Sequence, residues 1–382
     1  MAGVFKVVVS GLFAAILASY NEPRGAQDWA TRYSELLSQS PIDDDPAVVN
    51  LPPYPAAKGV YKHNDKLQSL TKLGEGELLL PEDVQPDPTG TFLYVTNQDG
   101  WIRKYYLATA KVENWTYVGG RPLGLALDNA ANLIVCEPGQ NQLIQISKDT
   151  GVKTILSTEA EGVKYGLIDE VIVASDGLIY FTDGTYKYPL ATWWYDLLEG
   201  KPHGRLLVYD PKTNTTSVLV KNIQFANGVA LSKSEDYLLY CESTTARVIK
   251  LHLKGSNKGK SEVFINNLPG HPDNIHRNKA GDRFYLALLF NRNALYDFVF
   301  KTPVLKLLLA WDEKLYSLYD NSPSIARVLE LDEEGKPLRL FEDSTGKVIA
   351  MLTTAVPSSD GRYLYVGGLR DNFVGRFSLS TD

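Results

Sequence analysis

The sequence predicts an all-β protein, a six-bladed β-propeller with short helical insertions. A turn of small or polar residues followed by an apolar strand occurs six times along the chain, and helical patterns are few. A strand-turn-strand unit that returns roughly every 40 to 60 residues is typical of propellers with four-stranded blades. A pair of β-sandwiches is the competing architecture, but it would leave this sixfold self-similarity as an accident.

The repeated units share a polar turn that leads directly into a strand. They cover residues 87–96, 128–136, 174–182, 232–241, 278–288 and 358–367. Outer strands are visible at residues 101–106 and 247–252, where apolar and polar side chains alternate. Such alternation is what a strand with one covered face requires, so each repeat has room for four strands.

Three segments divide the chain before and within the propeller. An apolar run at residues 7–18 follows Lys6 and is shorter than the ~20 residues of a membrane span, so residues 1–20 are expected to be a signal peptide or a signal anchor. Residues 21–61 show little periodicity and are expected to form a variable leader. The propeller is expected to occupy residues 62–382.

The net charge of the chain restricts its possible binding partners, and its sequons and cysteines indicate the cellular compartment. A net charge of −6 and a pI near 5.5 argue against a nucleic-acid partner, which would need a basic face, and leave small molecules, cations and proteins open. The sequons at Asn114 and Asn214 predict glycosylation in the secretory pathway, in the endoplasmic reticulum, the vacuole or outside the cell. Cys136 and Cys241 each lie inside an apolar strand, so two free buried thiols are expected rather than a disulfide.

Two insertions interrupt the repeats. The first, residues 186–200, is aromatic and contains Trp193 and Trp194; the second, residues 291–321, is strongly apolar. Long connections in a compact domain are usually functional or disordered, and the second is too apolar for disorder. It is expected to be a helix packed on the propeller, a lid over its mouth or a surface that contacts a membrane. Membrane contact through the N-terminus is the other expectation of this kind.

Oxygen-bearing side chains precede an apolar strand in four of the repeats. They stand at residues 82–83, 169–170, 227 and 273–274. Equivalent positions in successive repeats of a propeller lie around one axis, so this pattern suggests a central metal site. The alternative is that Asp and Asn at these junctions only cap backbone groups.

Four motifs carry a family resemblance. The segments at residues 181–183, 199–207, 225–229 and 268–275 resemble the strictosidine synthase-like family, in particular the branch that includes the adipocyte plasma membrane-associated protein and plant strictosidine synthase-like proteins. The resemblance covers about residues 79–379. It implies a six-bladed propeller related in fold to paraoxonases, gluconolactonases and diisopropyl fluorophosphatase, which hold a catalytic calcium in the central tunnel.

The resemblance also implies a ligand set. The family pattern places the metal ligands at Glu82, Asp169, Asn227, Asp273 and Asn274, with Asp169 standing where an Asn is usual. Three carboxylates with one or two amides form a hard oxygen site that suits Ca²⁺ better than a metal that prefers nitrogen or sulfur. The five His residues are scattered, so a His-based zinc centre is not expected.

One family feature is missing. Alkaloid-forming members carry a glutamate in the last blade that acts as the acid/base of the Pictet–Spengler condensation, and this sequence has Thr354 there. No Asp, Glu or His lies within residues 349–356. A threonine hydroxyl does not titrate usefully, so strictosidine synthase activity is not expected.

Three functions follow as hypotheses. The first is a calcium-dependent hydrolase of esters or lactones, in which Asp273 activates water or attacks the carbonyl. Its substrate would be aromatic or lipophilic and would contact Trp193, Trp194 and His271. The second is a condensing enzyme of the strictosidine synthase type, disfavoured by Thr354. The third is a propeller that binds a partner or acts as a scaffold without catalysis.

Overall fold

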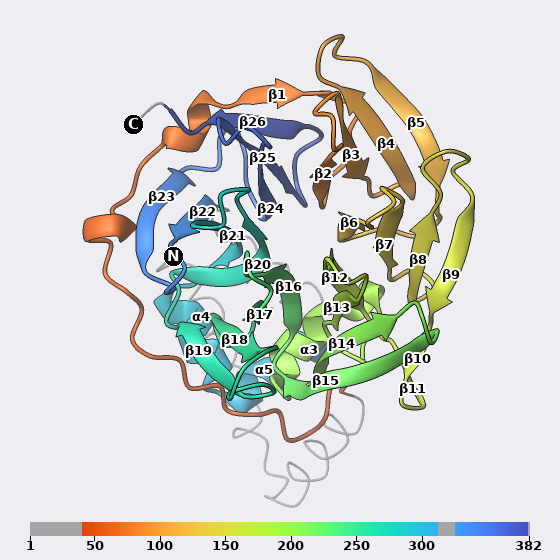
Figure 1. Ribbon diagram of the computed structural model, residues 1–382. Helices are drawn as coiled ribbons and strands as arrows, with labels where there is room; N and C mark the ends of the chain where they lie inside the picture. The colour runs from red at the N-terminus through yellow and green to blue at the C-terminus, as the bar shows by residue number, and fades with distance from the viewer. Residues whose placement is uncertain (1–39, 312–324, 381–382) are drawn as a thin grey trace, which may run out of the picture.

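The chain folds into a ring of six blades, as the repeats predict. A computed structural model describes residues 40–311 and 325–380. Six four-stranded antiparallel sheets stand around one central axis, and a two-stranded hairpin is attached to the outside (Figure 1). The predicted signal segment, the first part of the leader and the end of the second insertion lie outside the described residues.

Each of the first five blades is a meander whose first strand lies at the axis and whose last lies at the rim. The first two blades consist of β2 (Val84–Pro86), β3 (Phe92–Thr96), β4 (Trp101–Tyr106) and β5 (Val112–Tyr117), then β6 (Leu125–Leu127), β7 (Leu133–Glu137), β8 (Gln142–Ile146) and β9 (Lys153–Ser157). The third and fourth consist of β12 (Ile168–Val173), β13 (Ile179–Asp183), β14 (Gly204–Asp210) and β15 (Thr215–Ile223), then β16 (Ala226–Leu231), β17 (Tyr237–Glu242), β18 (Arg247–His252) and β19 (Ser261–Ile265). The fifth consists of β20 (Gly270–Arg277), β21 (Phe284–Asn291), β22 (Ala326–Leu331) and β23 (Pro337–Asp343), and the outer hairpin is β10 (Glu159–Ala160) with β11 (Val163–Lys164).

The sixth blade closes the ring with strands from both ends of the propeller. Its inner strands are β24 (Leu352–Pro357), β25 (Tyr363–Gly368) and β26 (Val374–Ser378). The rim strand is β1 (Thr71–Leu73), which pairs antiparallel with β26. Two 3₁₀ turns, η1 (Gly59–Tyr61) and η2 (Lys66–Ser69), lead into it along the outside of the fifth blade. Backbone hydrogen bonds between chain segments about 300 residues apart therefore hold the ring shut.

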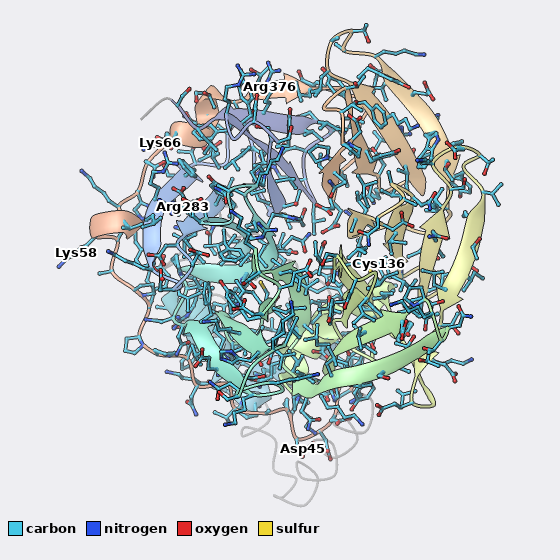
Figure 2. The ribbon with its side chains drawn as sticks, in the orientation of Figure 1. Asp45, Lys58, Lys66, Cys136, Arg283 and Arg376 are labelled. Atoms are coloured by element: carbon cyan, nitrogen blue, oxygen red, sulfur yellow. The ribbon has the colours of Figure 1, made fainter. Side chains whose placement is uncertain are left out.

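The core lies between neighbouring blades. Ile134 and Cys136 of β7 pack against Phe181 of β13 and Leu207 of β14, and all four are fully buried. Each such side chain contributes about 1.5–3 kcal/mol by leaving water. Cys136, and Cys241 in the corresponding strand β17, are free and buried, as expected. Figure 2 shows Cys136 inside the wall of the ring, whereas Lys58 and Asp45 lie at its edge.

The two insertions form one helical layer on one side of the ring. They fold into η3 (Leu190–Thr192), α3 (Trp194–Glu199), α4 (Ala294–Phe300) and α5 (Pro303–Trp311). Asn293 caps α4 by accepting a hydrogen bond from the Tyr296 amide at 2.9 Å. The helix α5 contacts both α3 and α4 (Figure 1). We call these helices the lid.

The second half of the leader is a strap across the lid. Residues 42–53 run along the helices, and Ile42, Val49 and Leu51 are buried in the same apolar cluster as the lid. The Ala47 amide donates to the Glu199 carbonyl at 2.8 Å, and the Val49 amide donates to the carbonyl of the last residue of α4 at 3.0 Å. A segment that the sequence shows only as aperiodic thus fastens one insertion to the other.

Candidate functional site

The five residues proposed as metal ligands gather where the inner strands begin. Glu82 stands just before β2, Asp169 lies in β12, Asn227 in β16, and Asp273 and Asn274 in β20. Each is at most 5% exposed. Four of them, all but Asn274, line one cavity of about 70 Å³ at the lid end of the central channel. The Asn274 amide nitrogen donates to Glu82 Oε1 at 3.1 Å and so ties the fifth blade to the first.

Bulges turn these side chains toward the axis. The pairing of β12 with β13 shifts register between Ile168 and Val171, and β20 shifts against β21 between Pro272 and Ile275. The inner strand β16 has a corresponding shift around Asn227. A bulge places an extra residue against the partner strand and re-aims the local side chains. Consecutive residues, such as Asp273 and Asn274, therefore both approach the axis instead of alternating between two faces.

Glycine lets neighbouring inner strands approach at the same level. A Cβ built on Gly228 would lie 2.4 Å from the Asp273 carbonyl oxygen and 2.6 Å from the Asn274 Cα. Both are backbone atoms, which cannot move without shifting β20. The absence of a side chain at Gly228 therefore helps to set the position of Asp273.

Burial and mutual repulsion govern the charge of the cavity. Burial, followed by the neighbouring Asp83 and Asp273 carboxylates, raises the pKa of Glu82 well above its usual range. Burial and the charge of Asp169 raise the pKa of Asp273 in the same direction. Burial and Asp183 raise the pKa of Asp169 to about 7. Without a cation, this site therefore favours protonated carboxyl groups.

Asp83 and Glu170, which follow Glu82 and Asp169 in the sequence, are also buried. Asp83 is fully buried and accepts hydrogen bonds from Thr354 Oγ1 at 2.6 Å and from the Leu125 amide at 3.2 Å. Glu170 is 1% exposed, and burial together with Asp83 raises its pKa well above the usual range. The sequence pattern predicts ligands only at Glu82 and Asp169, the first member of each acidic pair, and does not predict this second set.

The donor set fits a hard cation. Glu82 Oε2, Asn227 Oδ1 and Asn274 Oδ1 are buried and have no hydrogen-bond partner. An unpaired buried polar group costs about 1–3 kcal/mol, and an ion that prefers oxygen ligands would offset that cost. Within the described residues, no three His, Cys, Asp or Glu side chains already form a group that could hold a metal. The carboxylates would therefore have to draw together on binding.

The lid supplies an apolar roof to the cavity. Leu190 and Trp193 from the first insertion line it together with Phe225 and Leu289 from the blades. Trp193 stacks on Phe290 with ring centroids 5.9 Å apart. Trp193 is thus placed to contact a ligand.

Trp194 and His271, the other residues expected to bind substrate, do not line this cavity. The Trp194 ring packs on Tyr195 at 4.0 Å. His271 Nδ1 donates a hydrogen bond to the Ser243 carbonyl at 2.7 Å, and its ring packs on Tyr296 of α4 at 4.2 Å. Burial lowers the pKa of His271 to about 4, so this imidazole is neutral near pH 7 and lies beneath the lid.

Thr354 lies on β24 among polar neighbours, where its hydroxyl donates to Asp83 and contacts His276 Nε2 at 2.8 Å. Thr353, the preceding residue, is the one that lines the cavity. Neither side chain titrates in a useful range, which agrees with the absence of the Pictet–Spengler acid/base.

The sequence interpretation did not include Arg121, which lines the cavity from the loop between β5 and β6. Its Nε and Nη2 atoms are buried without a hydrogen-bond partner. The loop precedes a blade that contributes no oxygen ligand, so no repeat pattern marks the position. The contact depends on how the blades are arranged around the axis.

Comparison with known proteins identifies the family. The family model for strictosidine synthase matches residues 169–256, and the model for the N-terminal part of strictosidine synthase-like proteins matches residues 59–105. Protein STRICTOSIDINE SYNTHASE-LIKE 6 from Arabidopsis thaliana is 37% identical over 311 residues, which cover 80% of this chain and 81% of the relative. The chain belongs to the strictosidine synthase-like family. The adipocyte plasma membrane-associated protein of Rattus norvegicus is also similar, with 31% identity over 368 residues that cover 91% of this chain and 95% of the relative.

Solved structures share the fold of this strictosidine synthase-like protein. A gluconolactonase from Xanthomonas campestris aligns with a TM-score of 0.57 at 14% identity and covers 81% of this chain and 88% of its own. Regucalcin from Agrobacterium tumefaciens, described as a calcium-binding protein, aligns with a TM-score of 0.54 at 12% identity and covers 78% and 90%. At these identities the likeness concerns the fold alone.

The sequence-based expectations about glycosylation and the membrane concern the surface. Asn114 lies on β5 and Asn214 in the turn between β14 and β15, and both are exposed. Of the helices in residues 40–311 and 325–380, none has the length and apolar character needed to cross a bilayer.

Proposed function

We propose that this strictosidine synthase-like protein is a calcium-dependent hydrolase of esters or lactones. The observation that carries the proposal is the convergence of Glu82, Asp169, Asn227 and Asp273 on one buried cavity that contains unpaired oxygen atoms. Burying three carboxyl groups and an amide without a cation costs free energy. The same oxygen atoms suit Ca²⁺ as ligands. These four residues would hold the ion together with Asn274, whose Oδ1 is unpaired while its amide nitrogen donates to Glu82. When bound, calcium supplies positive charge that polarises a carbonyl.

Asp273 is the residue we assign to the reaction itself. It is 3% exposed and borders the cavity, so a substrate carbonyl under the lid would lie within its reach. As a carboxylate it can take a proton from water or attack the carbonyl carbon directly. Without a cation, burial and the charge of Asp169 raise its pKa, and a bound cation would lower it again and so favour the ionised form that the reaction needs.

The roof favours an aromatic or lipophilic substrate. Trp193, Leu190 and Phe225 present apolar surface opposite the carboxylates. A small cavity with an apolar wall and a few convergent polar groups is the usual form of a site for a small organic molecule. The side chains of the lid would also keep bulk water away from Asp273.

The compartment proposed is the secretory pathway, with membrane contact through the N-terminal run or through residues 291–321. One relative is named for association with the plasma membrane. The helix α5 of the second insertion exposes Val304 and Trp311, by 41% and 53%. Co-sedimentation with phosphatidylcholine vesicles tests the contact: Trp311→Ser should weaken it, and equal binding by both proteins would assign it elsewhere.

Hydrolysis of phenyl acetate and a panel of small lactones, with and without chelator, tests the proposed activity. Calcium-dependent turnover that Asp273→Asn abolishes is the expected result. Amine–aldehyde condensation would instead support the condensing enzyme, which Thr354 disfavours. Absence of both activities, with a tight partner in a pull-down, would support the scaffold function.

A further inference from the structure

Arg121 carries a buried guanidinium edge that no protein group pairs. In the described part of the chain, neither its Nε nor its Nη2 has a hydrogen-bond partner, although both atoms are buried. An arginine side chain stays charged at every pH at which proteins fold, so the group cannot reduce this cost by losing a proton. Nε and Nη2 lie on the same edge of the planar fork, which is the edge that matches the two oxygens of a carboxylate.

Other arginines of this protein use the same edge to bind carboxylates. Arg292 donates from Nε to Asp297 Oδ1 at 2.8 Å and from Nη2 to Oδ2 at 3.0 Å. Arg205 donates from the same two atoms to Asp183 Oδ2, at 3.1 and 2.6 Å. The corresponding edge of Arg121 lacks such an acceptor, and Arg121 lines the cavity that contains Asp273.

Glu82, the carboxylate whose charge acts on Arg121, does not form this pair. Its Oε1 accepts from Asn274, and its Oε2 has no hydrogen-bond partner. No carboxylate of the described chain therefore pairs with this edge of Arg121, which leaves it open to an acceptor on a ligand. Because the cavity is small and three carboxylates already border it, a singly charged group fits better than a doubly charged phosphate.

We propose that Arg121 binds a carboxylate group of the ligand, so that the substrates are esters or lactones that carry a carboxylate near the scissile bond. This inference rests on the proposed function, because it concerns the same cavity. It adds that the cation and the organic anion bind cooperatively. Any cavity carboxylate that is ionised repels an anionic ligand, and a bound cation offsets that repulsion.

Binding of a matched pair of small molecules tests the role of Arg121. Phenylacetate and phenylacetamide have nearly the same shape and differ in charge, and tryptophan fluorescence or calorimetry reports their binding without turnover. With calcium present, the unaltered protein should prefer phenylacetate by about tenfold to a hundredfold, the range expected for hydrogen bonds to a charged group. With EDTA, the preference should disappear.

Variants separate recognition from folding. Arg121→Gln should reduce the preference to less than about threefold, and Arg121→Lys, which keeps the charge but loses the fork, should retain part of it. Arg362→Gln, at a side chain that is 71% exposed, is the matched control and should behave like the unaltered protein. An unchanged preference in a folded Arg121→Gln protein would overturn the proposal. Stronger binding of inorganic phosphate than of phenylacetate would overturn the choice of a carboxylate.

The test of Arg121 can fail or succeed independently of the test of hydrolase activity. Calcium-dependent turnover of neutral esters that Arg121→Gln leaves unchanged would retain the hydrolase and reject the role of Arg121. A carboxylate preference that depends on calcium and on Arg121, in a protein without esterase or lactonase activity, would retain the anion site and reject the hydrolase.

Discussion

Replacing Asp169 by asparagine should stabilise the metal-free protein at neutral pH. In the folded protein, burial and then Asp183 raise the pKa of Asp169 from 3.8 to about 7. Between these two values the unfolded chain has released the proton while the folded protein keeps it. The stabilising contribution of Asp169 to the free energy of unfolding is therefore fully present below pH 3.8, its pKa in the unfolded chain. This contribution falls as the pH rises toward 7, its pKa in the folded protein.

The size of the effect follows from the shift. Between pH 5 and pH 7, Asp169 alone should lower the free energy of unfolding by about 2 kcal/mol, and the total loss from low pH to pH 7 amounts to about 4 kcal/mol. The pKa values of Glu82 and Asp273 are shifted in the same direction, so they add to the trend. Asp169→Asn removes the titrating group and should raise stability at pH 7 while it weakens calcium binding.

Urea denaturation in EDTA at pH 5 and pH 7 measures this difference. Asp149→Asn, at an exposed position, serves as the control and should leave the pH dependence unchanged. Equal stability of the unaltered protein at the two pH values, together with no gain in Asp169→Asn, would refute the claim that burial strains this carboxylate.

Two substitutions test the residues that support the site and the lid, and a glycosidase treatment tests the secretory route. Gly228→Ala should destabilise the protein by about 1–3 kcal/mol in denaturant titrations and weaken calcium binding, because its Cβ would collide with the Asp273 backbone; unchanged values would show that β16 and β20 can separate freely. Glu199→Ala should cost about 1–3 kcal/mol, because it leaves the buried Tyr188 hydroxyl without its acceptor and removes one partner of Lys187, and should speed proteolysis of the strap; resistance equal to that of the unaltered protein would contradict the fastening role. Glycosidase treatment of protein secreted from a eukaryotic host should shift its gel mobility unless both Asn114 and Asn214 are replaced by Gln; no shift in the unaltered protein would count against the secretory route.

The repeats predicted the blades because a strand with one covered face has a period of two, and the turns between strands require polar or small residues. The side chains of Asp169 and Asn227 could be placed near the axis because each begins the first strand of its repeat. Family resemblance turned that placement into a ligand set. Only the structure shows that these side chains line one cavity.

Other features depend on tertiary contacts that no local pattern records. Arg121 reaches the cavity from a loop, and β1 joins β26 across the whole length of the propeller. The strap is held by contacts with helices far along the chain, so its sequence alone is aperiodic. His271 was expected at the substrate, but the bulge that turns Asp273 toward the axis leaves His271 beneath α4.

The central claim is that the cavity at the channel end holds calcium and needs it for hydrolysis. Metal analysis of the purified protein, combined with melting curves and phenyl acetate turnover in EDTA, tests it most directly. A ligand held only by the folded state stabilises it by about 2.7 kcal/mol at a hundredfold excess over its dissociation constant. The expected result is stoichiometric calcium, a lower melting temperature and loss of turnover in EDTA, and recovery of both when calcium is restored. Protein without calcium, with the same melting curve in EDTA, would contradict the claim.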